Sequence, residues 1–209
     1  MKLTSNDIQH NTPINQRFCF GRIDPSDHVA LADNISPHLA WTGVPGESRS
    51  LVVICVDSDV PSKPDDVNKE DREVPADLPR GNFYHWLMVD IPPSVSELAT
   101  GSCSNGVVPR GKSKPPGPAG SRQGLNDYSN WFAGDKDMAG DYFGYDGPCP
   151  PWNDSIIHHY HFRLYALDCA RLKLPEKFTG DDVLAAMKGH VLAEAELSAS
   201  YTLNPRLGQ

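Results

Sequence analysis

Three apolar stretches decide the fold. They read Leu-Val-Val-Ile-Cys-Val-Asp at 51–57, His-Trp-Leu-Met-Val-Asp-Ile at 85–91 and His-His-Tyr-His-Phe-Arg-Leu-Tyr-Ala-Leu-Asp at 158–168. Because side chains alternate between the two faces of a strand, each stretch predicts one buried face. The predicted faces are Leu51, Val53, Cys55 and Asp57; His85, Leu87, Val89 and Ile91; and His158, Tyr160, Phe162, Leu164 and Ala166.

Each of these predicted faces begins or ends in an ionisable side chain. If the first strand runs antiparallel to the other two, Asp57, His85 and His158 meet at one edge of a shared core. Burying such groups costs free energy unless they are paired or bind a ligand. The sequence therefore predicts a binding site at this edge.

Taken one at a time, these residues have simpler interpretations. Asp57 and Asp59 resemble a turn in which carboxylates accept backbone N–H groups, and a lone histidine such as His85 is more often a satisfied core residue. His159 and His161 alternate to the opposite face from His158 and predict a solvated outer surface. Only the joint pattern favours a site.

Composition limits the class of protein. A length of 209 residues suits a single domain over 1–209, and the net charge of −8 disfavours a nucleic-acid binder. No apolar run predicts a membrane span, and the first residues predict no signal peptide. The five cysteines are widely spaced without a CxxC pair, which favours a reduced cytoplasmic protein without disulfides or a cysteine zinc site.

The remaining segments predict turns, loops and one helix. Residues 61–81 are charged and rich in proline, and 110–122 form a basic loop that we expect to be flexible unless a partner covers it. A helix is predicted after the capping residue Thr179, with apolar positions continuing to Val191, and 197–203 predict a last strand.

Several motifs that define enzymes are absent from the sequence. It contains no HExxH, no Gly-x-Gly-x-x-Gly, no Walker sequence and no Gly-x-Ser-x-Gly. The segment Gly144-Tyr145-Asp146-Gly147-Pro148-Cys149-Pro150-Pro151 could bring free backbone N–H groups to an anion, or could be an ordinary stiff turn. Asp57, His85 and His158 could in principle hold a divalent metal, but without a dense ligand motif we expect no metal there, no catalytic residue and no cofactor.

Five segments occur in the order Asp57-Ser58-Asp59-Val60-Pro61, His85-Trp86-Leu87, Gly147-Pro148-Cys149-Pro150-Pro151, His158-His159-Tyr160 and Leu164-Tyr165-Ala166-Leu167-Asp168. This order resembles the phosphatidylethanolamine-binding protein family, in its bacterial and archaeal branch related to Raf kinase inhibitor protein. The resemblance covers about residues 30–203. It departs at Ser58 and Val60, where the family has Pro and Ala, and at His159, where it has Arg, which puts an outer salt bridge in doubt.

The resemblance implies a mainly β fold with a large central antiparallel sheet, a smaller sheet and peripheral helices. It implies a cavity for small anions such as phosphate, phosphoethanolamine, acetate or sulfate. The residues that it carries over as ligand-binding are Asp57, Asp59, His85, Gly147, His158 and Tyr160.

The chemistry of these residues suggests a division of roles. Tyr160 and the imidazoles of His85 and His158 can donate to phosphate oxygens, which predicts tighter anion binding below pH 7 than above pH 8. Asp57 would orient or charge a histidine, share a proton with the ligand, or meet the cationic end of a zwitterion.

Three functions stay open at this point. The first is a small-ligand-binding module that recognises phosphate-like or phospholipid head groups and regulates other proteins. The second is an inhibitor or scaffold that docks a kinase or a protease through its surface. The third is a hydrolase that uses the Asp/His cluster, and it ranks last because the sequence offers no activated nucleophile.

Overall fold

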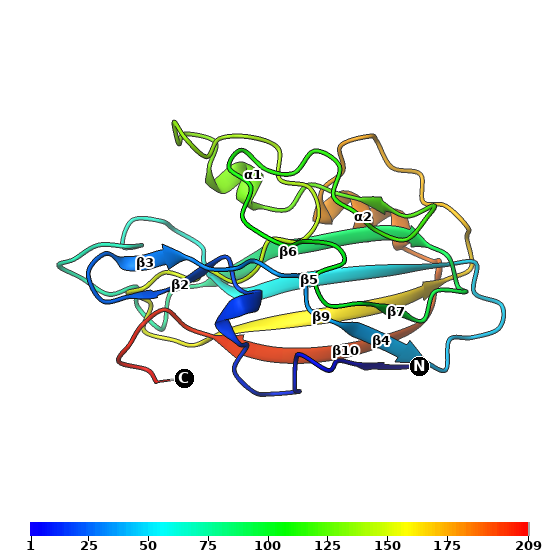
Figure 1. The fold of residues 1–209 in the computed structure, drawn as a ribbon, viewed down its shortest axis with the longest axis horizontal. Helices are drawn as coiled ribbons and strands as arrows, with labels where there is room; N and C mark the ends of the chain where they lie inside the picture. Colours follow the sequence, from blue (N-terminus) through cyan, green and yellow to red (C-terminus); the bar gives the residue numbers. More distant parts are fainter. Residues whose placement is uncertain (209) are drawn as a thin grey trace.

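The computed structural model describes residues 1–208 and is built around one central antiparallel sheet (Figure 1). Its strands lie in the order β10-β9-β5-β6-β8, so β5 pairs antiparallel with both β6 and β9 as the sequence predicted. The strands are β5 (Ser50–Pro61), β6 (Arg80–Ile91), β8 (Arg122–Gln123), β9 (His158–Leu167) and β10 (Val191–Tyr201).

Smaller elements surround this sheet. A second sheet has the order β1-β4-β7, from β1 (Lys2–Thr4), β4 (Leu39–Thr42) and β7 (Glu97–Leu98), and β2 (Gly21–Asp24) forms a hairpin with β3 (His28–Leu31). The helices are the 3₁₀ turn η1 (Gln16–Phe18), α1 (Tyr128–Trp131) and α2 (Gly180–Met187). The predicted fold class, mainly β with peripheral helices, is confirmed.

The central sheet is covered on both faces. On one face, Leu51 and Val53 of β5 pack in a cluster that includes Trp41 of the small sheet. On the other face, Val52 and Ile54 pack in a cluster that includes Val183 of α2. Burial on both faces explains why β5 reads as a continuous apolar run rather than a strict alternation.

A β-bulge in β6 changes the predicted face of that strand. The pairing with β5 shifts between Cys55↔Trp86 and Val56↔Tyr84, so His85 is an extra residue on β6. Trp86 packs in the cluster on the cavity side, whereas Leu87 packs in the cluster on the other side. The prediction that His85 shares a face with Leu87 and Val89 was wrong, because strict alternation fails at a bulge.

The C-terminal helix is shorter than predicted. Thr179 and Asp182 form the expected capping box, and the helix ends at Met187. Gly189 follows with a φ of +84°, and Val191 already begins β10. The apolar positions that were assigned to one helix up to Val191 therefore belong to two elements, the helix α2 and the strand β10.

Residues 110–122 have two anchors that the sequence did not reveal. Lys112 pairs with the buried Asp146 at 2.6 Å, and Arg122 pairs with Asp90 at 2.6 Å. Flexibility of this loop stays a prediction. Because Lys112 and Arg122 are held by these pairs, the prediction now applies only to the residues between them. Within residues 1–208, no helix combines the length and the apolarity that a membrane span requires.

Candidate functional site

A cavity of about 680 Å³ opens at the end of the central sheet where β9 begins. Four of the predicted site residues line it, namely Asp57, His85, His158 and Tyr160. Asp57 of β5 pairs directly with Tyr160 of β9, and the rings of His85 and Tyr160 lie 5.3 Å apart. The three strands therefore bring these side chains together, as the sequence pattern predicted.

His158 is held between two carboxylates. Its Nδ1 donates to Asp57 at 2.7 Å and its Nε2 donates to Asp154 at 3.0 Å, with the imidazole fully buried. Arg80 makes two hydrogen bonds to Asp154, at 2.7 and 3.1 Å. Both ring nitrogens are thus occupied by carboxylates, and donation from His158 to a ligand stays a prediction. We name this series, Arg80–Asp154–His158–Asp57, the ionic chain.

The ionic chain fixes the charges of its members. Burial alone would lower the pKa of His158, but Asp57 and Asp154 outweigh it and raise the pKa to about 9. Burial would raise the pKa of Asp57, yet the charge and hydrogen bond of His158 leave it below its usual value. Two cations and two carboxylates thus neutralise one another at neutral pH, beside the cavity.

His85 has a different environment. Its Nδ1 lies 2.8 Å from the backbone carbonyl of Asp146, and because a carbonyl only accepts, this nitrogen carries the proton. Burial lowers the pKa of His85, although Asp57 opposes the shift. At neutral pH the ring is therefore neutral, and Nε2 is an acceptor on a side chain that lines the cavity.

The support of His85 is itself a buried polar cluster. The carboxylate of Asp146 accepts from Asn34 at 2.7 Å, from Asn126 at 2.8 Å and from Lys112 at 2.6 Å. Burial raises the pKa of Asp146, and Lys112 partly offsets the shift. This cluster fixes the backbone carbonyl that sets the tautomer of His85.

The hydroxyl of Tyr160 lies at the cavity beside Asp57. The residue is fully buried, and within residues 1–208 no hydrogen-bond partner meets its hydroxyl with normal geometry. Burial and then the charge of nearby Asp57 raise the pKa of the phenol, so it stays protonated. A buried donor without a partner costs roughly 1–3 kcal/mol, which a ligand oxygen could recover.

Two of the predicted ligand-binding residues do not line the cavity. Asp59 donates its backbone N–H to Asp57 at 2.8 Å, while its carboxylate turns outward to His159, also at 2.8 Å. A hydrogen bond between Asp59 and His159 thus occupies the place of the outer salt bridge that the resemblance put in doubt. Asp59 therefore supports the site without facing its interior.

Gly147 has a packing role. Its backbone N–H donates to Asn34 at 2.8 Å and its carbonyl accepts from Tyr128 at 2.8 Å. A Cβ at this position would lie 2.1 Å from the carbonyl oxygen of Phe18. Close packing of two backbones explains the glycine, and its own N–H is occupied by Asn34, whereas anion binding by the surrounding backbone stays a prediction.

Other residues of the cavity escaped the sequence analysis. Asp154 lies four residues before His158, a spacing that carries no recognisable pattern in a loop. Leu31 and Trp131 line the cavity while 55% and 49% exposed, which gives it an apolar rim. Cys149 also lines it, but burial raises the pKa of its thiol to about 12, so the site contains no thiolate nucleophile there.

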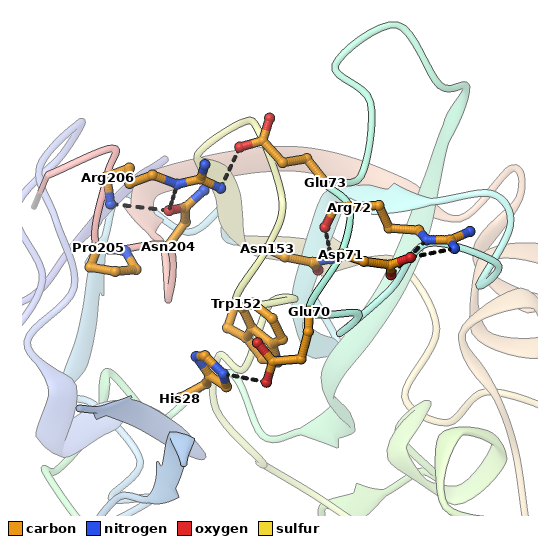
Figure 2. Close-up of a pocket in the computed structure, with 10 residues that line it drawn as sticks. All are labelled: His28, Glu70, Asp71, Arg72, Glu73, Trp152, Asn153, Asn204, Pro205 and Arg206. Atoms are coloured by element: carbon orange, nitrogen blue, oxygen red, sulfur yellow. Dashed lines mark hydrogen bonds and ion pairs between the residues drawn. The ribbon is translucent and has the colours of Figure 1, made fainter. Parts of the chain in front are cut away.

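A second pocket, of about 420 Å³, adjoins the β2–β3 hairpin (Figure 2). There the ring of His28 stacks on Trp152 with centroids 3.8 Å apart and pairs with Glu70 at 2.8 Å. Arg206 pairs with Glu73 across the same pocket. Its charged side chains already have partners in these exposed pairs, so this pocket lacks the unsatisfied donor that distinguishes the cavity.

Comparisons with known proteins agree with this architecture. The sequence profile of phosphatidylethanolamine-binding protein matches residues 4–202. A UPF0098 protein of Methanothermobacter thermautotrophicus is 39% identical over 181 residues, covering 87% of this chain and 91% of the relative. The UPF0098 protein YbhB of Escherichia coli is 30% identical over 202 residues, covering 97% and 100%.

Solved structures give the same result. Escherichia coli YbcL, described as a member of the mammalian PEBP family, superposes with a TM-score of 0.67 at 25% identity, covering 96% of this chain and 97% of that one. A Chlamydia trachomatis homolog of phosphatidylethanolamine-binding protein superposes with a TM-score of 0.62 at 30% identity, covering 96% and 95%. The chain belongs to the phosphatidylethanolamine-binding protein family.

Proposed function

We propose that this protein is a binding module for small phosphate-like anions, including phosphate esters of the phospholipid head-group type. The observation that carries the proposal is the hydroxyl of Tyr160, which is buried at the cavity beside Asp57 and makes no hydrogen bond of normal geometry among the described residues. A protein tolerates such a cost where a ligand satisfies the group. An oxygen of a phosphate or carboxylate is the matching acceptor.

The other groups of the cavity narrow the ligand further. The ionic chain carries no net charge and offers no free donor on His158. Neutral His85 presents an acceptor, so a singly protonated phosphate could donate to its Nε2 while accepting from Tyr160. The carboxylate of Asp57 suits the ammonium end of a zwitterion such as phosphoethanolamine.

The rim suits an apolar substituent. Leu31 and Trp131 are among the exposed large apolar residues of the described chain, and both face the opening of the cavity. An anion that carries an alkyl or aryl group would bury this surface. The same rim favours the second candidate function, in which the protein docks a kinase or a protease and the cavity acts as its switch. Pull-down with and without phosphoethanolamine tests that candidate.

We propose binding rather than catalysis at this site. His158 cannot act as a general base while both ring nitrogens donate to carboxylates. A screen of phosphate esters with and without divalent metal would oppose the proposal if turnover required His85 or Tyr160. We further propose a cytoplasmic location, which the five free cysteines favour.

The experiment that tests the proposal uses Tyr160→Phe. Removing the hydroxyl should weaken phosphoethanolamine binding about 3- to 10-fold, the value of one hydrogen bond, measured by NMR titration. It should also leave the free energy of unfolding equal or higher, because an unsatisfied buried donor disappears.

Tyr142→Phe is the matched control. Tyr142 donates to the carbonyl of Met138 at 2.8 Å and lies outside the cavity. This variant should lose about 1 kcal/mol of stability and keep its ligand affinity. Equal affinities for wild type and Tyr160→Phe would refute the proposed role of the hydroxyl.

A further inference from the structure

Three side chains of different chemistry meet at the opposite end of the central sheet from the cavity. Asp168, Cys169 and His190 each offer a ligand atom, and these atoms all lie within 4.8 Å of one another. Within residues 1–208 this is the one group of its kind. Because β9 runs from His158 to Leu167, the group lies roughly 30 Å from the cavity at the standard strand rise.

The backbone holds these residues in place. The N–H of Asp168 donates to the carbonyl of His190 at 3.0 Å, joining the end of β9 to the start of β10. The carbonyl of Cys169 accepts from the hydroxyl of Ser50 at 2.6 Å. The carbonyl of Leu167 accepts from the N–H of Arg49 at 2.8 Å. Three chain segments thus fix the backbone that carries the three ligand residues before any ion binds.

We propose that Asp168, Cys169 and His190 form a binding site for zinc or a similar divalent transition metal. A thiolate, an imidazole and a carboxylate are the donor types that zinc uses, whereas magnesium and calcium prefer oxygen alone. Three protein ligands leave a fourth tetrahedral position for water. The site is separate from the proposed anion cavity and does not depend on it.

The present geometry needs only a small adjustment to accept the ion. Asp168 Oδ1 and His190 Nδ1 lie 2.7 Å apart, and metal binding at Nδ1 would place the proton of the neutral ring on Nε2. The thiol of Cys169 would release its proton, since only a thiolate coordinates. Donor atoms around tetrahedral zinc are about 3.3–3.6 Å apart. The side chains of Asp168 and His190 are 49% and 46% exposed and are free to rotate by that amount.

The charges around the group also suit a cation. Burial, followed by the negative charges of Asp168 and Asp90, raises the pKa of the Cys169 thiol, and the positive charge of Arg49 opposes the shift. A bound divalent ion would balance these negative charges and join β9, β10 and the segment that carries α2.

The test is titration of the full-length, chelator-treated protein with cobalt(II), followed by zinc. Cobalt should bind with one equivalent and give the intense near-ultraviolet band of cobalt–thiolate charge transfer, and zinc should remove that band. Cys169→Ser should abolish the band. Cys169→Ser and His190→Ala should each weaken zinc binding at least about tenfold.

His159→Ala is the matched control. Its imidazole pairs with Asp59 at 2.8 Å, much as His190 pairs with Asp168, but it belongs to no three-ligand group in the described chain. This variant should keep the full affinity for zinc. Absence of the charge-transfer band at millimolar cobalt, or equal loss of affinity in His159→Ala, would overturn the proposal. Unfolding curves in chelator verify that each variant folds.

Discussion

His158 and His85 adjoin the same cavity, yet their environments differ in every respect that matters for binding. His158 donates from both nitrogens to buried carboxylates and stays charged. His85 donates once, to a backbone carbonyl, and stays neutral. The comparison teaches that a histidine serves structure when its partners are complete and is available to a ligand when one nitrogen remains unused.

The strongest way to break this comparison is to interrupt the ionic chain at Asp154→Ala. The change leaves the cations of Arg80 and His158 short of a buried partner, so stability should fall by about 3–5 kcal/mol. Urea unfolding measures the loss. Glu70→Ala removes the exposed partner of His28 and should change stability by less than about 1 kcal/mol. Similar losses of stability in the two variants would show that the buried ionic chain contributes no more to stability than an exposed ion pair.

The second prediction concerns pH. The pKa of His158 is about 9 in the folded protein and near 6.5 when unfolded, so its stabilisation is complete below about pH 6.5 and disappears as pH rises through 9. The difference corresponds to something on the order of 3 kcal/mol. NMR titration should find His158 still protonated at pH 8, whereas His85 should titrate below its usual range. Titration of His158 near pH 6.5 would contradict the assignment.

The central sheet could be predicted from the sequence because burial on two faces leaves a clear apolar run in each long strand. Alternation also placed Asp57, His158 and Tyr160 correctly at one edge. His85 reached the same cavity for a different reason, because the bulge puts it beside Trp86 on one side of the sheet. A bulge inserts one residue without any compositional mark here, so strict alternation could not reveal it.

The partners of the site were harder to predict. Asp154 and Arg80 are separated by more than seventy residues, and neither has a local pattern that links it to His158. The packing role of Gly147 could not be predicted, because a glycine required by backbone packing and one that exposes an N–H group look alike in sequence. Pairing between distant loops is a property of the tertiary structure, and a single sequence does not encode it visibly.

A third prediction tests the open histidine. His85→Asn should weaken sulfate binding about tenfold at pH 5.5, where wild type can charge its imidazole, and have a smaller effect at pH 8. The sign follows from the lowered pKa of His85: the unliganded fold favours the neutral ring, so protonation needs lower pH and a bound anion assists it. Sulfate is the suitable probe because, unlike phosphate, it does not titrate in this range. Calorimetry at both pH values measures the affinities of wild type and variant. An equal effect of His85→Asn at the two pH values would count against the proposed role of His85.

The smallest expected effect lies on the outer face of β9, at the residue that follows His158. His159→Arg introduces the arginine that the resemblance expects and places a cation opposite Asp59. His159 is 58% exposed, and exposed ion pairs contribute little, so the free energy of unfolding should change by less than about 0.5 kcal/mol. Anion affinity should also stay unchanged, because Asp59 supports Asp57 through its backbone N–H rather than its carboxylate. A loss of affinity above about threefold would show that the pair of His159 and Asp59 acts on the cavity through Asp59. In that case the distinction between structural and ligand-facing side chains, which holds for His158 and His85, would not hold for the outer face of β9.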